Sequence, residues 1–329
     1  MLLLENQQKI SPKNKFVDKK LQFLRIYILG GFLSMSINKT DFLLGLKLQR
    51  GIGYVKLLRI AKELDVDKVD QAWIDRVDLP QELKSAIIKA CCDEKTAKMC
   101  QQIKQQCRVI SFFDDEYPEC LRQIYRPPLI LFARGNIELL KKDIITIVGS
   151  RLATHYSQKV IEKLVPNIVA SGKVIASGLA KGVDTMAHIA TLENDGATIA
   201  VVGNGLNHYY PVQNQLLQKR IEKQGLILSE YLPDTIAKPY RFPERNRILA
   251  GISQGVVVTE AKAKSGSLIT ANLALQENRD VYAIPGPITS ALSEGPNRLI
   301  ESGAIPVVDY RLDEKETFDK EDKNTLFSS

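Results

Sequence analysis

Short apolar segments alternate with helical segments from residue 144 to residue 284, and this alternation restricts the fold more than any other feature. The apolar segments are rich in Val and Ile, and several end at Gly or Ser. Such strands, each followed by a helix, predict βαβ units and hence an α/β fold with helices on both faces of a parallel sheet. The strands are expected at 144–148, 174–176, 198–202, 226–228, 256–258 and 281–284. The helices are expected at 157–171, 184–194, 213–224, 246–253 and 268–277.

The region before the sheet has helical periodicity instead. Apolar residues recur at helical spacing after Gly53, and further helices are expected at 80–88 and 93–107. Gly51-Ile-Gly53 followed by a helix resembles the turn of a helix-hairpin-helix, whose backbone amides can hold a DNA phosphate. A plain glycine turn in a small helical bundle is the simpler alternative.

The two ends of the chain look unlike folded domains. The apolar stretch 21–33 is too short to span a bilayer, which takes about 20 residues, and Arg25 interrupts it. Met35 reads like a natural start, so we expect residues 1–34 to be an upstream extension. The last residues are polar and charged, as in a frayed tail. The expected organisation is an extension or disordered segment at 1–38, a helical domain at 39–108, the α/β domain at 109–310 and a charged tail at 311–329.

Charge separates these parts. The net charge is +7, yet residues 1–60 carry 11 basic and 3 acidic side chains, whereas residues 111–329 carry 25 and 26. The basic character therefore belongs to the N-terminal part, and it weakly favours a polyanionic partner there. The five cysteines form no CxxC pair and the chain has three histidines, which argues against a zinc site or a secreted disulfide framework. We expect reduced cysteines, a cytoplasmic protein, and no metal or cofactor.

The residues that follow the strands are suited to phosphates. The carboxyl ends of parallel strands meet at one edge of a sheet, where ligands bind. Glycines permit close approach, hydroxyls donate hydrogen bonds, and a helix that starts there offers free amides. The candidate phosphate-binding or DNA-binding residues are Gly149, Ser150, Arg151, Ser177, Gly178, Lys181, Gly182, Gly203, Gly205, Lys219, Arg245, Asn246, Arg247, Ser265, Gly266, Ser267 and Thr270.

Each of these elements has a plainer interpretation. Gly149-Ser-Arg151 is also compatible with a tight turn and a solvated arginine, and Ser265 with an ordinary helix cap. The two arginines of 245–247 could instead pair with Glu244 or Glu260. Their convergence on one edge of one sheet is what favours a binding site.

The glycines do not fit two common nucleotide motifs. Gly149-Ser-Arg lacks the spacing of the dinucleotide fingerprint, and no Walker lysine loop is present. Catalytic patterns are also thin: Glu260 is the best single candidate for an acid, although it could equally bond the amides of a neighbouring loop. Aromatic side chains at Tyr209, Tyr210, Tyr240 and Phe242 are available for stacking on bases.

The motifs together resemble the DNA-processing protein A family, also called Smf. The resemblance covers residues 110–308 strongly and 40–108 loosely. It is carried by 147–151, 177–188, 205–211, 228–230, 242–251, 260–271 and 285–286. It implies a Rossmann-like domain that binds single-stranded DNA, preceded by a small helical domain of the SAM or helix-hairpin-helix type. It also implies a homodimer, and a role in natural transformation in which the RecA recombinase is loaded onto the strand.

The resemblance also assigns roles to residues. It implies that Arg151 contacts the strand. Several relatives place a lysine soon after the Tyr-Pro pair, where this chain has Gln213-Asn-Gln, with Lys219 about one turn later. The residue that makes the second basic contact is therefore open. The winged-helix module of many relatives is not expected here.

Two other classes of function compete with a non-enzymatic DNA-binding protein. A nucleoside-monophosphate phosphoribohydrolase on a similar fold would use Glu260 with Ser265-Gly-Ser267, although the Pro-Gly-Gly loop of such enzymes is absent. A pure interaction protein would use the basic N-terminal part and keep the sheet as a scaffold. We expect no catalytic residue and no membrane association.

Overall fold

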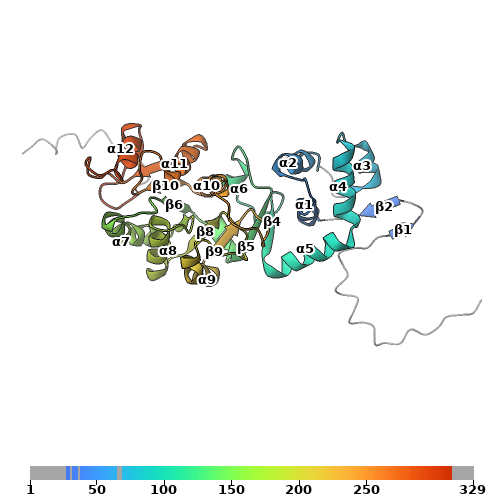
Figure 1. The fold of residues 1–329 in the computed structure, drawn as a ribbon, viewed down its shortest axis with the longest axis horizontal. Helices are drawn as coiled ribbons and strands as arrows, with labels where there is room; N and C mark the ends of the chain where they lie inside the picture. The colour runs from blue at the N-terminus through green and yellow to red at the C-terminus, as the bar shows by residue number, and fades with distance from the viewer. Residues whose placement is uncertain (1–26, 30–31, 36–37, 65–68, 313–329) are drawn as a thin grey trace, which may run out of the picture. The chain divides into compact units, whose positions relative to one another are not determined.

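The computed structural model describes residues 27–29, 32–35, 38–64 and 69–312 (Figure 1). The chain divides into two compact units, Met1–Gln105 and Gln106–Ser329. The division between the two units falls after Gln105, three residues before the boundary expected at 108. Of the segment expected as an extension, residues 1–26, 30–31 and 36–37 lie outside the described residues, and so does all of the expected tail beyond residue 312.

The first unit contains five helices and a small antiparallel sheet within its described residues. Asn38 starts the first helix, because its side-chain oxygen accepts the N–H of Thr40 at 2.8 Å. Phe42 packs edge-on against Trp73 at 6.5 Å between ring centres, in a core that the leucines of the first helix complete. The elements are β1 (Tyr27–Leu29), β2 (Phe32–Met35), α1 (Lys39–Lys47), α2 (Tyr54–Lys62), β3 (Val69–Asp70), α3 (Gln71–Arg76), α4 (Gln81–Cys92) and α5 (Glu94–Gln106).

The expected helical region is thus present, with two differences. The sheet β1-β2-β3 was not expected, and β1 and β2 fall inside the segment 1–38. The helix α3 was also missed, since its six residues give too short a pattern to show a period.

The second unit is built on a nine-stranded sheet in the order β12-β11-β10-β6-β7-β8-β9-β5-β4. The seven strands from β12 to β9 are parallel, and β5 and β4 extend the β9 edge antiparallel. The strands are β4 (Arg108–Ser111), β5 (Ile130–Gly135), β6 (Ile144–Val148), β7 (Val174–Ser177), β8 (Thr198–Val202), β9 (Leu226–Ser229), β10 (Gly255–Val258), β11 (Asp280–Ala283) and β12 (Ile305–Pro306).

Helices cover both faces of this sheet, as the strand–helix alternation predicted. Figure 1 shows α7, α8 and α9 along one side and α10 and α11 along the other. Ile145 and Ile147 of β6 pack against α7 and α8, whereas Ile144 and Val148 face the opposite cores. The helices are α6 (Glu119–Arg122), α7 (His155–Ala170), α8 (Val183–Glu193), α9 (Gln215–Gln224), α10 (Arg241–Ile252), α11 (Gly266–Gln276) and α12 (Glu294–Glu301), with 3₁₀ helices at Ile137–Lys141 and Val212–Asn214.

This unit differs from expectation in β4, β5, β12, α6 and α12, which were not expected, and in the start of α10. The antiparallel strands β4 and β5 were not foreseen, because neither is followed by a helix of the repeating pattern. The helix α10 starts at Arg241, five residues before the expected start, and so includes Pro243 in its first turn. Proline is tolerated there because the first amides of a helix have no partner within the helix.

Candidate nucleic-acid interface

The order of the strands places a crevice beside β6. The chain runs from β6 through β7 and β8 to β9, and then returns to β10 on the other side of β6. Loops that leave neighbouring strands in opposite directions open a crevice at their carboxyl ends. A cleft of about 570 Å³ lies there, between the residues after β6 (Gly149–Leu152) and those after β10 (Lys262–Ser267).

Four positive side chains from three segments line this cleft. They are Arg151 after β6, Arg245 of α10, and Lys262 and Lys264 after β10. Asp184 is the only acidic residue among the described residues that line it. A smaller pocket of about 220 Å³ shares Arg151 and Arg245 with the cleft, adds Lys181, and has no acidic residue in its described lining. The two pockets together form a surface suited to an extended polyanion.

Two aromatic rings stand between the cleft and the smaller pocket. Tyr210 and Phe242 line both, and their ring centres are 5.0 Å apart with the planes inclined at 34°. The guanidinium of Arg151 lies over the Phe242 ring, 5.6 Å from its centre. Tyr210 is 43% exposed, so part of its side chain is accessible from the solvent. Stacked rings beside cations are typical of surfaces that bind single strands.

Arg245 is fixed inside the wall of the cleft. It is 5% exposed and donates from Nη1 to the carbonyl of Gly178 at 2.7 Å and to that of Val201. Burial lowers the pKa of Arg245 to about 10, which leaves the guanidinium charged at neutral pH. Because these two carbonyls hold its guanidinium, Arg245 supplies a fixed positive charge rather than a mobile contact. The carboxylate of Asp184 is held as well, since it accepts the backbone N–H groups of Gly178 and Ala180 at 3.1 and 3.2 Å.

The hydroxyls after the strands divide into structural and open groups. Ser177 donates to the carbonyl of Ile147 and Ser267 to that of Gly149, both at 2.7 Å, so these two hydroxyls bind the protein's own backbone. Ser150 accepts the N–H of Leu152 at 3.0 Å and shapes its turn. The Oγ of Ser265, at the start of α11, is buried and makes no hydrogen bond within the described part of the chain. Ser265 thus has the one hydroxyl among these four that the described part of the chain leaves unbonded.

Most of the predicted glycines make room for protein atoms. A Cβ at Gly149 would overlap Val183, one at Gly178 the guanidinium of Arg245, and one at Gly203 the ring of Phe242. Gly205 packs in the same way against the backbone after β9, and Gly182 combines a φ of +75° with contact to Ser150 O. These glycines let the loops pack on one another.

Gly266 is different from these glycines. A Cβ there would meet nothing within 4 Å, and the residue lies in the first turn of α11, inside the cleft. The helix end is therefore accessible, and its free amides and positive dipole favour an anion. Asn246 steadies this end, because its Nδ2 donates to the carbonyl of Gly266 at 3.2 Å. Thr270, one turn further along α11, also lines the cleft.

Three further predicted residues lie outside the cleft lining. Arg247 binds both carboxylate oxygens of Glu230 at 2.7 Å, with both side chains mostly buried. A structural ion pair was among the interpretations that the sequence allowed, but with Glu244 or Glu260 as the partner rather than Glu230. The Nζ of Lys219 lies over the ring of Tyr209, 5.7 Å from its centre. Ser177 is fully buried, and its hydroxyl bonds the carbonyl of Ile147 in β6.

Glu260 holds one wall of the crevice together. It is 2% exposed and accepts the Thr154 N–H and hydroxyl at 2.8 Å each and the Ser157 hydroxyl at 2.7 Å. These bonds join the end of β10 to the start of α7, which is the second of the two readings that the sequence left open. A carboxylate with this many partners inside the protein is a poor candidate for acid–base chemistry.

Lys262 and Lys264 are functional candidates that the sequence analysis missed. They lie between β10 and α11, in Glu260-Ala-Lys-Ala-Lys-Ser265, and the motif drew attention to its serines. The alternation of small residues and lysines before a helix start was the available signal. In the part of the chain that the structure describes, no cluster of three metal-ligating side chains occurs. Nor is any described helix both long and apolar enough to cross a membrane.

Comparison with known proteins gives a consistent family. The family described as DNA recombination-mediator protein A matches residues 108–314. The DNA processing protein DprA of Streptococcus pneumoniae is 49% identical over 194 residues, which cover 59% of this chain and 68% of that protein. The corresponding Bacillus subtilis protein is 43% identical over 202 residues, covering 61% and 68%. The Smf protein of Escherichia coli is 41% identical over 194 residues, covering 59% and 52%.

Two solved structures are similar as well. The crystal structure of DNA processing protein A from Streptococcus pneumoniae has a TM-score of 0.73 and 38% identity, and the match covers 83% of this chain and 95% of that one. A structure of DNA processing protein A from Helicobacter pylori, described for its single-stranded DNA binding mode, has a TM-score of 0.56 and 30% identity. That match covers 62% of this chain and 93% of the other.

Proposed function

Because the chain belongs to the DNA recombination-mediator protein A family, whose members include DNA-processing proteins, we propose that its cleft binds single-stranded DNA. The observation that carries the proposal is the combination of cations with two paired rings around one open crevice. Arg151, Lys262 and Lys264 contact phosphates, while Tyr210 stacks on a base. The single-strand binding named for the Helicobacter pylori relative supports this assignment.

The start of α11 is the strongest phosphate position in this proposal. It combines the unbonded hydroxyl of Ser265, the open backbone of Gly266 and the charge of Lys264. Arg151 faces the same volume from the β6 side, and Lys181 continues the positive surface into the smaller pocket. Lys181 lies beside Tyr210 and Pro211 there, so it takes the second basic contact better than Lys219 does.

The proposed activity is binding without catalysis, because the best candidate acid, Glu260, is bonded within the protein. By its resemblance to the family, the protein would act as a homodimer in the cytoplasm and load the RecA recombinase onto incoming strands in natural transformation.

Fluorescence anisotropy with labelled poly-dT over a salt series tests the cleft. Arg151→Ala should weaken binding and reduce the slope of log affinity against log salt by about 0.7, the contribution of one phosphate on a single strand. Lys142→Ala is the matched control, because Lys142 is exposed and precedes β6, at the opposite end of that strand. Equal affinities for Arg151→Ala and the wild type would refute the proposal. The RecA step is tested by filament assembly on the same strand with and without the protein.

A further inference from the structure

A second positive surface lies in the first unit, far along the sequence from the cleft. No acidic residue occurs between Asp41 and Glu63, a run of 21 positions. Five basic side chains fall within it, and four of them lie on α2 or the turn before it. They are Lys47, Arg50, Lys56, Arg59 and Lys62.

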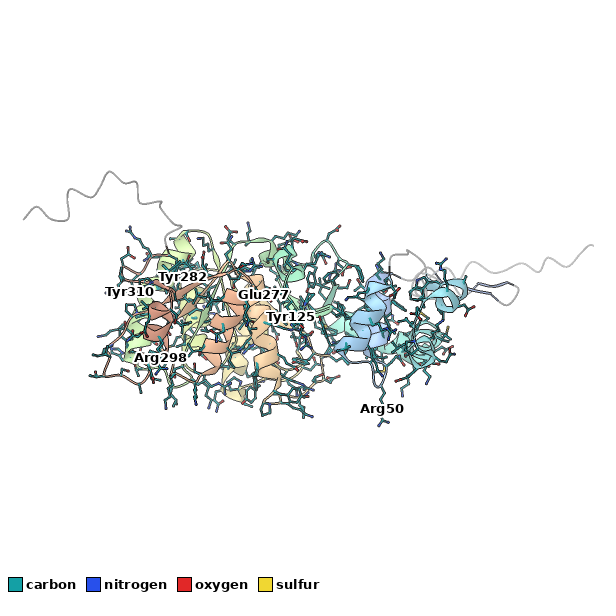
Figure 2. The ribbon with its side chains drawn as sticks, turned by 90° about the horizontal axis from the view of Figure 1, so that it is seen from above. Arg50, Tyr125, Glu277, Tyr282, Arg298 and Tyr310 are labelled. Carbon is teal, nitrogen blue, oxygen red and sulfur yellow. The ribbon has the colours of Figure 1, made fainter. Side chains whose placement is uncertain are left out.

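The helix α2 exposes a positive face because most of its apolar residues point inward; Val55, which is 74% exposed, is the exception. Leu57, Ile60 and Ala61 are buried, whereas Arg59 and Lys62 are exposed and share the opposite face. The turn before the helix adds Arg50, and Figure 2 shows this side chain reaching away from the body of its unit. We call Arg50, Gly51, Gly53, Arg59 and Lys62 the α2 surface.

Within the described residues, these cations differ in how they are bonded. Lys56 pairs with Glu82 at 2.7 Å, so its charge is balanced. Arg59 donates to the backbone carbonyl of Asp78 at 3.4 Å, a long bond to a neutral group. Arg50 and Lys62 make no hydrogen bond or ion pair within the described part of the chain. The exposed Glu63 borders the surface at its far end.

The turn glycines leave the backbone accessible. Gly51 has a φ of +83°, which explains why it is glycine. Gly53 has an ordinary φ of −86°, and a Cβ there would meet nothing within 4 Å. The fold does not require glycine at 53, in contrast to the packed glycines around the cleft. A backbone without a side chain permits close approach from outside.

We propose that the α2 surface binds the phosphate backbone of duplex DNA. Its charge is complementary to a polyanion, and Arg50, Arg59 and Lys62 can each neutralise a phosphate. It offers no exposed ring for stacking, since Phe42 is 2% exposed and Tyr54 is half-buried. A duplex keeps its bases stacked inside and presents phosphates, which is what this surface can contact. The proposal is independent of the single-strand cleft.

The test uses the full chain and a labelled blunt-ended duplex, with affinity measured by anisotropy over a salt series. The double variant R50E/K62E should lose roughly tenfold or more in duplex affinity and reduce the salt slope by about 2, near one unit per phosphate contact. The matched control K89E/K95E reverses two exposed lysines of α4 and α5 and should change both quantities little. Gly53→Ala should also weaken duplex binding, while circular dichroism shows an unchanged melting temperature.

Poly-dT binding separates this proposal from the cleft. R50E/K62E should keep its affinity for poly-dT, which also shows that the variant is folded, and Arg151→Ala should keep its affinity for the duplex. Unchanged duplex binding by R50E/K62E would overturn the proposal. So would an equal loss in K89E/K95E, because net charge alone would then explain the effect. If poly-dT binding by Arg151→Ala is normal, the cleft assignment fails and the α2 surface is unaffected.

Discussion

Glu260 accepts two hydrogen bonds from Thr154, one from the backbone N–H and one from the side-chain hydroxyl, each at 2.8 Å. The pair connects the end of β10 to the start of α7, across the crevice that opens beside β6. The loop with Arg151 directly precedes Thr154 in the sequence. The position of the cleft's exposed arginine thus depends on a buried carboxylate that no ligand needs to touch.

Replacing this carboxylate should reduce stability. Glu260→Gln puts an amide N–H₂ among donors, so at least one buried donor loses its partner, at a cost of about 1–3 kcal/mol in the free energy of unfolding. Urea denaturation measures the change. Glu193→Gln, at the exposed end of α8, should stay within about 0.5 kcal/mol of the wild type.

The same residue decides between binding and catalysis. The wild-type protein incubated with AMP should release no adenine, as measured by chromatography. Adenine release that disappears in Glu260→Gln would contradict the structural role and favour the phosphoribohydrolase alternative.

Two glycines of the crevice should respond oppositely to alanine. In Gly178→Ala the new methyl group would overlap the Arg245 guanidinium, and overpacking of this kind costs about 1–3 kcal/mol. Gly266→Ala places its methyl in open space, so the free energy of unfolding should change by less than about 0.5 kcal/mol, while poly-dT affinity falls. Thermal melts and anisotropy on both variants check this. Normal poly-dT binding by Gly266→Ala would remove the start of α11 from the binding surface.

Loss of the exposed Tyr210 ring should lower the affinity for poly-dT without changing the salt dependence of that affinity. Tyr210→Leu removes a stacking surface worth about 1–3 kcal/mol per base and removes no charge. The salt slope for poly-dT should therefore match the wild type while affinity falls. Tyr125→Leu is the control: this tyrosine is 88% exposed beside Glu277, at the end of α11 away from the cleft (Figure 2). A changed slope in Tyr210→Leu would mean that the substitution also moves a cation.

His188 should make stability depend on pH. Thr198 donates its hydroxyl proton to the carbonyl of Ile175, so the Nδ1 of His188, 2.7 Å away, carries the proton of their bond. The Nε2 is buried and makes no bond within the described chain. Burial, with a contribution from Arg245, lowers the pKa of His188 from 6.5 to about 3. The folded protein therefore resists a proton that the unfolded chain takes up below pH 6.5.

Because the pKa of His188 is lower in the folded protein than in the unfolded chain, stability decreases as the pH falls. The stabilising contribution is complete above pH 6.5 and is lost as the pH falls towards 3, with about 2 kcal/mol lost between pH 7 and pH 5. Urea denaturation at the two pH values measures it, and His188→Gln should lack this part of the dependence. An equal dependence in the variant would assign it to other groups.

The sheet was predictable because its central strands are buried on both faces. Such strands must be continuously apolar, as in 144–148 and 198–202, and the six expected strands are present. The antiparallel strands β4 and β5 bury residues 109–111 and 130–133, yet no helix of the repeating pattern follows either of them, so the alternation does not reveal them. The antiparallel edge therefore depends on tertiary pairing that the local sequence does not encode.

The position of the candidate site was predictable from the sequence, but the separate role of each arginine within it was not. Arg151 and Arg245 were both expected from the rule that ligands bind at strand ends, and both line the cleft. Nothing in Arg245-Asn-Arg247 reveals that one arginine is fixed in the cleft wall and the other pairs with Glu230. Those partners are Gly178 after β7, Val201 in β8 and Glu230 directly after β9, which only the folded chain brings together.

The packed glycines have a consequence for how this crevice can change over time. Val183, Arg245 and Phe242 occupy the space where side chains at these glycines would lie. Mutations at these glycines therefore destabilise the fold before they change which ligand binds. The dimensions of the crevice are thus held constant by selection for stability. Packing does not constrain Lys262, Lys264 and Tyr210 in this way, since they project from the loops. Adaptation to a different strand length or base preference is therefore confined to the rim, where single substitutions change the stability of the fold little.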